Sequence, residues 1–367
     1  MKTEISRKIN FNAGPAGLPL PVLEQAQSEF VDYHGTGMSI MEHSHRGKAY
    51  ESAHTEALAL FAELLDLPAS HGVLALQGGA SLQFAMLPMN FLPAGRSADY
   101  IVTGHWAKIA LKEAGKVGTV RAAADSTGAD KRYVRVPSAS EISIDPKAAY
   151  VHMTSNNTIY GTQWSSLPDT KGLPLVSDMS SDILSRPIDA AKHALIYAGA
   201  QKNLGPSGLT IVAVNKDWLK DSRKDIPDIL RYETHLTANS LYHTPPSFAV
   251  YLFGLNLRWI KANGGAAGME KRNKAKAELL YGVLDRLSGF YKAPVEKASR
   301  SCMNVVFSTP TPALDDAFAA EAEKAGMTGL KGHRSAGGLR ASLYNAVSPE
   351  DAQTLTTFME DFAKRNG

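Results

Sequence analysis

The sequence LIYAGAQKNLGPSGL at residues 195–209 decides the fold class. An apolar run at residues 195–198 is followed by a single lysine, Lys202, and a second apolar run begins at residue 209, after a turn rich in glycine and proline. Both runs are continuously apolar rather than alternating, which is typical of strands buried on both faces of a sheet. This stretch predicts a buried sheet whose strands end in polar residues.

The same pattern recurs along the first two thirds of the chain. Further short apolar runs occur at residues 71–77, 100–103, 150–154 and 173–176. Helix-like spacing follows two of them, at residues 81–91 and 106–115. Strands that alternate with helices predict an α/β fold with a mostly parallel central sheet. Ligands bind such sheets beyond the carboxyl ends of the strands, so polar residues that follow strands are candidate site residues.

A second, smaller domain is expected after a helix-like stretch at residues 246–262, because the breaker Asn263-Gly264-Gly265 ends it. We therefore expect a large domain at residues 1–262 and a small α+β domain at residues 263–367. Its strands are predicted at residues 303–307 and 339–343, and its helices at 269–287, 314–325 and 349–364. Ser348 is the expected N-cap of the last helix.

The composition excludes several classes of protein. The chain has 367 residues, and its 39 Lys+Arg and 36 Asp+Glu give a net charge of +3, which is too small to indicate nucleic acid or a membrane surface as a partner. No apolar run approaches the ~18–20 residues that span a bilayer. The first ten residues, MKTEISRKIN, lack the apolar stretch of a secretory signal. With one cysteine, Cys302, and no zinc-like Cys/His spacing, we expect a metal-free cytoplasmic protein.

Lys202 and Asp178 are the candidate catalytic residues. A lysine held in a turn at the end of a buried strand is desolvated, which lowers its pKa and allows the neutral amine to form a Schiff base. Asp178 ends the run LPLVS, and a carboxylate there can hold a proton on a heterocyclic nitrogen, as pyridoxal phosphate requires. Taken singly, Lys202 would be a surface lysine and Asp178 a cap or turn residue, so the inference depends on their neighbours.

Three more strand ends carry groups that suit this cofactor. Gly78-Gly79-Ala80-Ser81 opens a helix, and its free N–H groups form a cup for one phosphate, because both the GxGxxG and the P-loop patterns are lacking. Trp106 can stack on a ring, although a core position is the alternative. Thr158 can bind a ring hydroxyl, although a turn role is the alternative. Gln201 can donate to an anionic oxygen.

A basic cluster predicts a substrate with two or more anionic groups. It comprises His45 and Arg46 in MEHSHRGK, and His333, Arg334 and Arg340 in GHRSAGGLRAS. Arginine binds carboxylates and phosphates with paired donors, and histidine adds a further hydrogen bond. For Arg46 and Arg334, a solvated surface position is the alternative. Arg340 lies inside the apolar stretch GLRASLY, where a charge without a partner is costly.

Together these stretches resemble the phosphoserine aminotransferase family, which are fold-type I pyridoxal-phosphate enzymes. The resemblance covers nearly the whole chain and rests on the following segments: NFNAGPAGLP (10–19), SIMEHSHRGK (39–48), QGGASLQF (77–84), TGHWAKIA (103–110), SNNTIYGTQW (155–164), SDMSSDILSRP (177–187), GAQKNLGPSG (199–208) and GHRSAGGLRASLYNA (332–346). It implies a fold-type I aminotransferase fold in which the first ~20 residues pack on the small domain. It also implies a homodimer with shared active sites.

The resemblance assigns a role to each candidate residue. Lys202 matches the Schiff-base lysine, Asp178 the partner of the pyridine nitrogen, Trp106 the stacking ring and Thr158 the contact to the cofactor's 3-hydroxyl. Ala80, Ser81 and Gln201 match the contacts to the cofactor's phosphate. Arg46 and Arg340 match the residues that bind carboxylates and substrate anions. His45, His333 and Arg334 match the group that holds the substrate's phosphate.

Two positions depart from the family pattern. His243 precedes Thr244 where asparagine is usual, in a pair that reaches the neighbouring subunit's cofactor phosphate. An imidazole N–H can replace that amide. Asn157 stands where glutamate is common.

The implied activity is reversible transamination of 3-phosphohydroxypyruvate with L-glutamate, in serine biosynthesis, with 4-phosphohydroxythreonine of pyridoxine biosynthesis as a further substrate that the resemblance allows. Two alternatives remain at this point. A cysteine desulfurase shares the fold but needs a mobile nucleophilic cysteine, and Cys302 falls in a predicted strand. A non-catalytic anion-binding α/β protein would use Lys202 merely as a phosphate contact.

Overall fold

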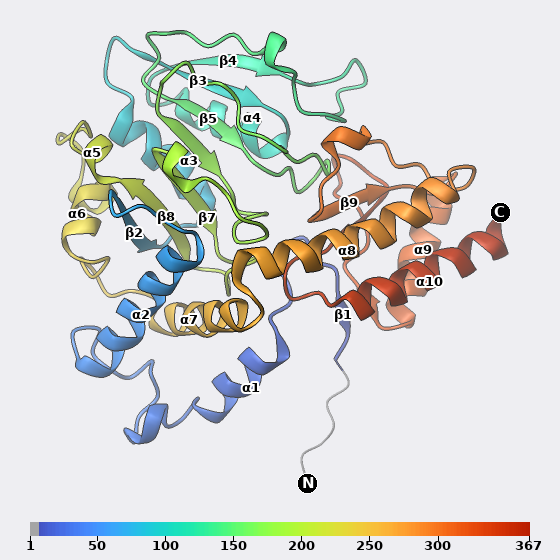
Figure 1. Ribbon diagram of the computed structural model, residues 1–367, viewed down its shortest axis with the longest axis horizontal. Coiled ribbons are helices and arrows are strands. Elements are labelled where there is room, and N and C mark those ends of the chain that lie inside the picture. The colour runs from blue at the N-terminus through green and yellow to red at the C-terminus, as the bar shows by residue number, and fades with distance from the viewer. Residues whose placement is uncertain (1–6) are drawn as a thin grey trace.

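The computed structural model describes residues 7–367, and its centre is a seven-stranded sheet. The strands are β2 (His71–Leu76), β3 (Ser97–Val102), β4 (Thr119–Asp125), β5 (Val151–Thr154), β6 (Leu175–Asp178), β7 (Leu195–Gly199) and β8 (Thr210–Asn215). Their order is β2-β8-β7-β6-β5-β3-β4. β8 pairs antiparallel with β2 and β7, and the other neighbouring strands of this sheet are parallel (Figure 1). The mostly parallel α/β sheet is confirmed. The edge strand β4 was not predicted.

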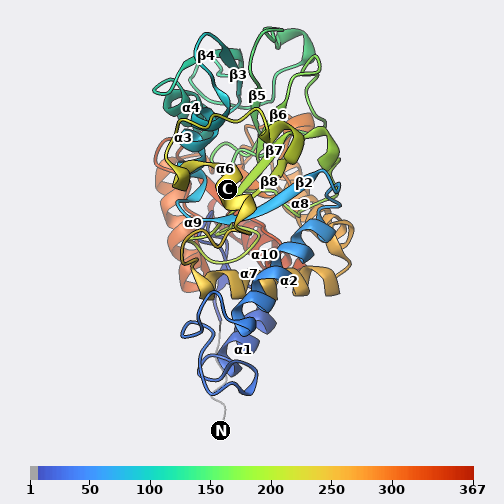
Figure 2. The ribbon, with the colours of Figure 1, turned by 90° about the vertical axis from the view of Figure 1, so that its left-hand side faces the viewer.

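Helices cover both faces of the sheet (Figures 1 and 2). The part of the chain up to residue 262, called the large part below, contains the following helices: α1 (Leu20–Ser28), α2 (Lys48–Leu64), α3 (Gly79–Phe91), α4 (His105–Ala114), α5 (Lys216–Leu219), α6 (Tyr232–Thr237) and α7 (Ser247–Ala262). The predicted helices after β2, after β3 and before residue 263 correspond to α3, α4 and α7. Short 3₁₀ turns lie at Tyr33–Gly35, Ala139–Glu141, Ala190–Lys192, Asp228–Leu230 and Lys297–Ser299.

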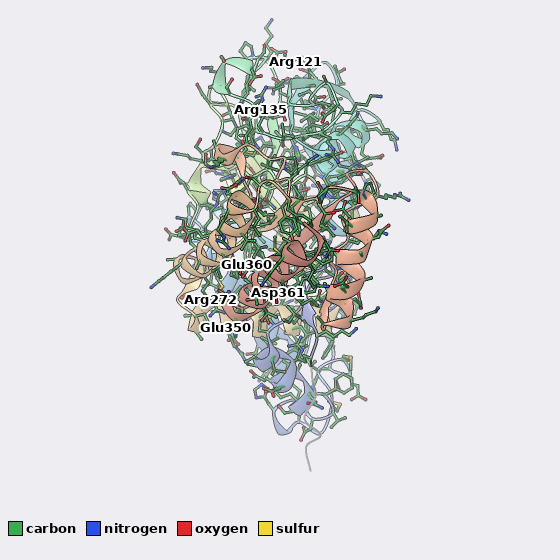
Figure 3. All side chains as sticks on the ribbon, turned by 90° about the vertical axis from the view of Figure 1, so that its right-hand side faces the viewer. Arg121, Arg135, Arg272, Glu350, Glu360 and Asp361 are labelled. Carbon is green, nitrogen blue, oxygen red and sulfur yellow. The ribbon has the colours of Figure 1, made fainter. Side chains whose placement is uncertain are left out.

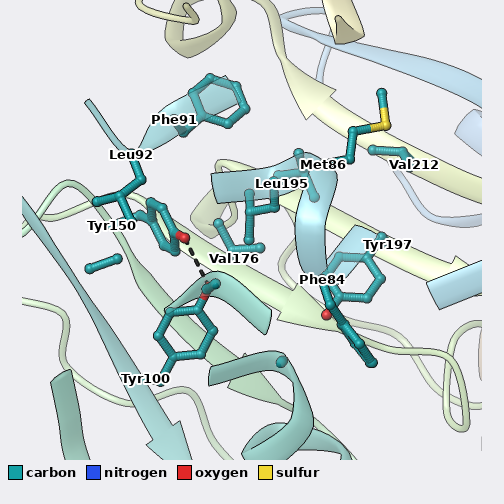
Figure 4. Packing of buried hydrophobic residues seen from close by; sticks show 14 of the residues in the cluster. Phe84, Met86, Phe91, Leu92, Tyr100, Tyr150, Val176, Leu195, Tyr197 and Val212 are labelled. Carbon is teal, nitrogen blue, oxygen red and sulfur yellow. Dashed lines mark hydrogen bonds between the residues drawn. The ribbon is translucent and has the colours of Figure 1, made fainter. Parts of the chain in front are cut away.

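The alternation of side chains along β7 places apolar groups on both faces of the sheet. Leu195 and Tyr197 belong to a core shared with α3 and α4, whereas Ile196 and Ala198 belong to a core shared with α2 and α7. Figure 4 shows the first core, in which the hydroxyl groups of two buried tyrosines, Tyr100 and Tyr150, form a hydrogen bond of 2.8 Å. A strand buried on both faces has no polar side, which explains the continuously apolar run in the sequence.

The C-terminal part is built around two small sheets. The strands β9 (Asn304–Phe307) and β11 (Leu339–Ser342) are antiparallel, and β1 (Ile9–Asn10) pairs in parallel with β10 (Met327–Thr328). The helices are α8 (Gly265–Arg286), α9 (Pro312–Lys324) and α10 (Pro349–Asn366). Figure 3 labels charged residues of two of these helices, the half-buried Arg272 of α8 and the exposed Glu360 of α10. The Ser348 hydroxyl accepts the Asp351 N–H at 3.0 Å, which confirms the predicted N-cap.

We propose the domain division near residue 262 on the basis of separate cores. A third core contains Phe307, Phe318 and Phe362, and Phe11 from the N-terminal segment packs in it. The first described residues therefore accompany the small part, as the resemblance implies. The prediction for the N-terminus also covers residues 1–6, which lie outside the described residues.

The turn at residues 343–347 of the small part is held by a buried lysine and contacts the large part. Lys276 of α8 is fully buried, and its ammonium donates to the carbonyl oxygens of Leu343, Tyr344 and Val347 at 2.8, 2.9 and 3.0 Å. The backbone N–H of Asn345, in the same turn, donates to Asn203 Oδ1 at 3.0 Å. The residue after Lys202 is thereby connected to the small part of the molecule. None of the helices within residues 7–367 is both long enough and apolar enough for a membrane span.

Candidate active site

The ends of five strands meet at one cavity of about 360 Å³. Segments after β2, β3, β5, β6 and β7 line it, together with residues from the N-terminal segment and from the loop before β11. Nine of the predicted site residues line this cavity: Ala80, Ser81, Trp106, Thr158, Asp178, Gln201, Lys202, His333 and Arg340. This geometry is the one expected from the sequence, in which polar residues that follow the strands meet at one edge of the sheet.

Lys202 projects into the cavity, where its ammonium donates to Thr158 Oγ1 at 2.9 Å. Burial lowers the pKa of Lys202 to about 8, against the opposing attraction of Asp178, and the positive charge of Arg340 lowers it further. The backbone of Gly14 approaches closely, since its φ is +130° and an added Cβ would lie 3.2 Å from Lys202 Cγ. The amine is therefore held in one place and is partly neutral near pH 8.

Asp178 ends β6 and is almost fully buried. Burial raises the pKa of its carboxyl group, while hydrogen bonds from Ser180 and the charge of Lys202 lower it. The Ser180 N–H and hydroxyl donate to the same oxygen, Oδ1, at 2.9 and 2.6 Å. Ser180 was missed in the sequence, although its position two residues after an aspartate is the signature of such a turn. The second carboxylate oxygen, Oδ2, accepts no hydrogen bond from the described residues and remains available to a ligand.

The helix α3 begins with the geometry expected of an anion cup. Gly78 and Gly79 have positive φ angles of 89° and 66°, and an added Cβ on Gly79 would meet nothing within 4 Å. No side chain caps the helix. The first-turn N–H groups beside Ala80 and Ser81 are thus left for a ligand, where the helix dipole favours a negative charge.

The small part contributes a buried cation to the cavity. Arg340 is 8% exposed, and its guanidinium donates to the Thr158 carbonyl oxygen at 3.1 Å. Among residues 7–367 it forms no salt bridge, and its Nε has no hydrogen-bond partner. A buried guanidinium without a counter-ion is costly, so this position favours an anionic ligand. His333 lies beside it, and burial together with nearby positive charge lowers the pKa of His333.

Five predicted residues lie outside this cavity in the single chain: His45, Arg46, His243, Thr244 and Arg334. Arg334 is exposed, directly after His333. The ring of His243 forms a hydrogen bond of 2.8 Å between Nε2 and Gln77 Oε1. Asn157, the second departure from the family pattern, is buried and donates to Thr103 Oγ1 at 3.1 Å and Thr162 Oγ1 at 2.9 Å, so it braces the turn that carries Thr158.

Several lining residues were not predicted from the sequence. They include Ala13, Gly14, Asn156, Ser180 and Ser181. His105 lies nearby, and its ring centre is 6.0 Å from that of His333. Ala13 and Gly14 belong to the segment NFNAGPAGLP, on which the family resemblance partly rests. Their position, however, follows the pairing of β1 with β10, which lies about 300 residues later. His105 directly precedes Trp106 and had the same strand-end signal.

Comparison with known proteins decides the family. The model of the family "Aminotransferase class-V" matches residues 9–355. A phosphoserine aminotransferase of Herpetosiphon aurantiacus is 54% identical over 358 residues, which cover 98% of this chain and 99% of that protein. This chain belongs to the phosphoserine aminotransferase family. The phosphoserine aminotransferase of Bacillus subtilis is 50% identical over 99% of this chain and 100% of its own length.

Solved structures of phosphoserine aminotransferases have the same fold. The enzyme from Bacillus circulans subsp. alkalophilus superposes with a TM-score of 0.96 at 52% identity, covering 98% of this chain and 99% of that chain. A structure described as pyridoxal-phosphate-bound phosphoserine aminotransferase from Trichomonas vaginalis gives 0.92 at 36% identity, covering 96% and 100%. Like its relatives, this chain is an aminotransferase with a fold-type I architecture, and the family activity places it in serine biosynthesis.

The family assignment argues against both alternatives from the sequence. A non-catalytic anion-binding role does not fit an aminotransferase family. Cys302 precedes β9, rather than lying in a strand as predicted, and does not line the cavity. Burial raises the pKa of its thiol, which opposes the reactive thiolate that a desulfurase needs. Within the described residues, no cluster of three metal-ligating side chains occurs.

Proposed function

We propose that this chain catalyses pyridoxal-phosphate-dependent transfer of the amino group of L-glutamate to 3-phosphohydroxypyruvate, giving 2-oxoglutarate and O-phospho-L-serine. The observation that carries the proposal is the convergence of Lys202, Asp178 and the N-terminus of α3 on one cavity with a buried arginine. The names of the relatives support the substrate.

The residues of the cavity fit pyridoxal phosphate. When bound, the cofactor supplies an aldehyde that accepts an amine and a protonated ring that withdraws electrons. Lys202 provides the amine, and the free oxygen of the Asp178 carboxylate is suited to the ring nitrogen. The N–H groups at the start of α3, with Ser81 and Gln201, suit the phosphate, and Trp106 and Thr158 suit the ring and its hydroxyl.

Lys202 is also suited to move the proton on which transamination depends. Its pKa of about 8 leaves a substantial neutral fraction at slightly alkaline pH. The neutral Nζ would remove the proton from Cα of the amino acid and return it at the carbon that carried the aldehyde. The hydrogen bond to Thr158 Oγ1 holds Nζ inside the cavity, which supports this role.

Both substrates share a carboxylate next to the reacting carbon, and each carries a second anionic group. Arg340 is the proposed binder of the shared carboxylate, because it is the buried cation of the cavity. The second group, a carboxylate in glutamate and a phosphate in the keto acid, would contact His333 and Arg334 at the rim. One basic pocket then serves both halves of the reaction.

We further propose a homodimer in which each subunit completes the site of the other. His45, Arg46, His243 and Thr244 lie outside the cavity of their own chain. The segment containing His45 and Arg46 exposes large apolar side chains, namely Leu20, Phe30, Val31, Met38 and Met41, and Tyr242 next to His243 is 45% exposed. Apolar groups gathered in this way are typical of a subunit interface.

A transamination assay tests the proposal. The purified chain is supplied with pyridoxal phosphate and L-glutamate, and 2-oxoglutarate is measured with keto acids that differ in the presence of a phosphate. We expect turnover with 3-phosphohydroxypyruvate and far less with unphosphorylated hydroxypyruvate. Equal turnover of both acids would contradict the substrate assignment. Product 4-phosphohydroxythreonine, supplied in the reverse direction, tests the second substrate that the family resemblance allows.

A further inference from the structure

A second cavity, of about 440 Å³, adjoins the proposed active site. Ile159 and Arg340 line both cavities. The other walls come from Tyr160, next to Ile159, and from four segments that are distant in sequence: the turn at residues 132–134, residues 288–294 after α8, residues 306–308 at the end of strand β9, and the loop at residues 332–339. The volume lies within the range of about 300–1,000 Å³ that is usual for small-molecule sites.

Most of the wall is apolar and aromatic. Tyr133, Tyr160, Tyr291 and Phe307 line the cavity, with aliphatic groups between them. The rings of Tyr133 and Tyr160 have centres 5.0 Å apart. Such walls suit a flat apolar body, because aromatic side chains stack on rings or meet them edge to face.

The charges of the cavity have one sign. Three cationic side chains line it, Arg132, Lys292 and Arg340, whereas no aspartate or glutamate does. None of the three forms a salt bridge with the residues that the structure describes. Arg340 is 8% exposed, and its Nε has no hydrogen-bond partner among them. A buried guanidinium with an unpaired donor, beside two further cations, selects an anionic ligand.

We propose that this cavity is a binding site for a small molecule that combines a flat apolar body with one anionic group. This site goes beyond the proposed transamination and does not depend on it. Two contacts connect it to the reaction. Arg340 is shared, and the Arg132 guanidinium donates to the carbonyl oxygen of Ala336, in the loop that carries His333 and Arg334. A ligand here therefore changes the affinity for the substrate anions.

The probe for the test is 2-naphthoate, with 2-naphthamide as a neutral ligand of the same shape. Binding to the cofactor-loaded protein is measured by calorimetry. We expect naphthoate to bind at least about tenfold more tightly than naphthamide, because hydrogen bonds between an anion and a desolvated cation are stronger than those of a neutral amide. We also expect Lys292→Gln to weaken naphthoate severalfold without changing naphthamide. Lys364→Gln, an exposed lysine on α10 outside the cavity, is the matched control.

A second pair of variants tests the position of the ligand. Ser288 is exposed and lines the cavity, so Ser288→Trp would narrow it without replacing a core residue, whereas Ser288→Ala would not. We expect Ser288→Trp to abolish binding of both probes while uptake of pyridoxal phosphate, which reports folding, is retained.

Three outcomes would overturn the proposal. Naphthoate does not bind, or the two probes bind equally well. The third is that glutamate displaces naphthoate completely while Lys292→Gln and Ser288→Trp leave its affinity unchanged. The last outcome would place the probe in the active site. Turnover without the probe is measured on the same variants. A loss of the proposed function and a loss of this site are therefore distinguished.

Discussion

The chemistry proposed for this chain depends on how the surroundings of single side chains change their protonation. Burial lowers the pKa of Lys202 and raises that of Asp178, and each charge partly offsets the other. The sequence predicted the direction for Lys202 from its position after a buried strand. The contribution of Arg340 to that shift could not be predicted, because it comes from a strand more than a hundred residues later and depends on tertiary packing.

The pH dependence of cofactor uptake tests the lowered pKa of Lys202. Only the neutral amine attacks an aldehyde, and a pKa of about 8 makes the neutral fraction rise between pH 7 and 9. We expect the rate of pyridoxal-phosphate uptake, followed by visible absorbance, to increase about tenfold over this interval and then to level off. Lys202→Arg, which keeps the charge, is the control and should show no uptake. A rate that keeps rising towards pH 10.5 would mean that the lysine is not desolvated.

Arg334 offers a test of the substrate-phosphate assignment. Arg334→Ala removes a cation at the rim while leaving Arg340 in the cavity. We expect KM for 3-phosphohydroxypyruvate to rise about 10–100-fold, because a charge-assisted hydrogen bond to the phosphate is lost. KM for glutamate should rise much less. Steady-state kinetics with each substrate varied in turn measures both. Equal increases for the two substrates would show that Arg334 does not discriminate phosphate from carboxylate.

At the scale of elements, the apolar runs in the sequence located six of the seven strands of the central sheet. The edge strand β4 was not predicted, because its sequence, TVRAAAD, has few β-branched and no aromatic residues and it pairs only with β3. The pair β1 and β10 also escaped, since it consists of two residues per strand brought together from opposite ends of the chain. Short pairs of this kind are set by tertiary packing rather than by local propensity.

Asn345 tests whether buried amides join the two parts of the molecule. Its side chain donates to the Leu184 carbonyl oxygen at 3.0 Å and accepts from Asn273 at 2.9 Å. Asn345→Ala removes the donor to the buried Leu184 carbonyl oxygen, whereas Asn273 keeps its hydrogen bond to Ser185, so we expect a loss of about 1–3 kcal/mol in the free energy of unfolding, measured in urea. Asn366→Ala, at the end of α10, should change it by less than about 0.5 kcal/mol. Similar values for the two variants would contradict a joining role.

At the scale of the whole molecule, the cavity forms where strand ends of the central sheet meet the N-terminal segment and the loop before β11. The large part alone contributes Lys202 and Asp178, which local sequence patterns identified. The placement of Arg340 beside them requires the small part to pack as it does, and strand patterns carry no information about that. His45 and Arg46 were predicted as part of a basic cluster, to which the family resemblance assigned roles, and their place outside the cavity of their own chain supports the proposal of a shared site.

Hybrid dimers test the shared site. Lys202→Ala and Arg46→Ala should each remove activity, for different reasons: the first removes the amine, and the second removes a cation supplied to the neighbouring subunit. If the two variants are unfolded, mixed and refolded, random pairing gives half hybrids with one intact site in two, so about a quarter of the wild-type activity should return. The same mixture prepared without exchange of subunits is the control. No recovery after verified exchange would mean that each chain completes its own site.

Borohydride reduction followed by peptide mapping examines the bond on which all of this chemistry depends. The protein is incubated with pyridoxal phosphate, reduced and digested, and the peptides are analysed by mass spectrometry. We predict one stoichiometric label, on the peptide that carries Lys202, and its loss when excess glutamate is added before reduction. A label on another lysine, or none at all, would contradict the placement of the cofactor between Lys202 and Asp178.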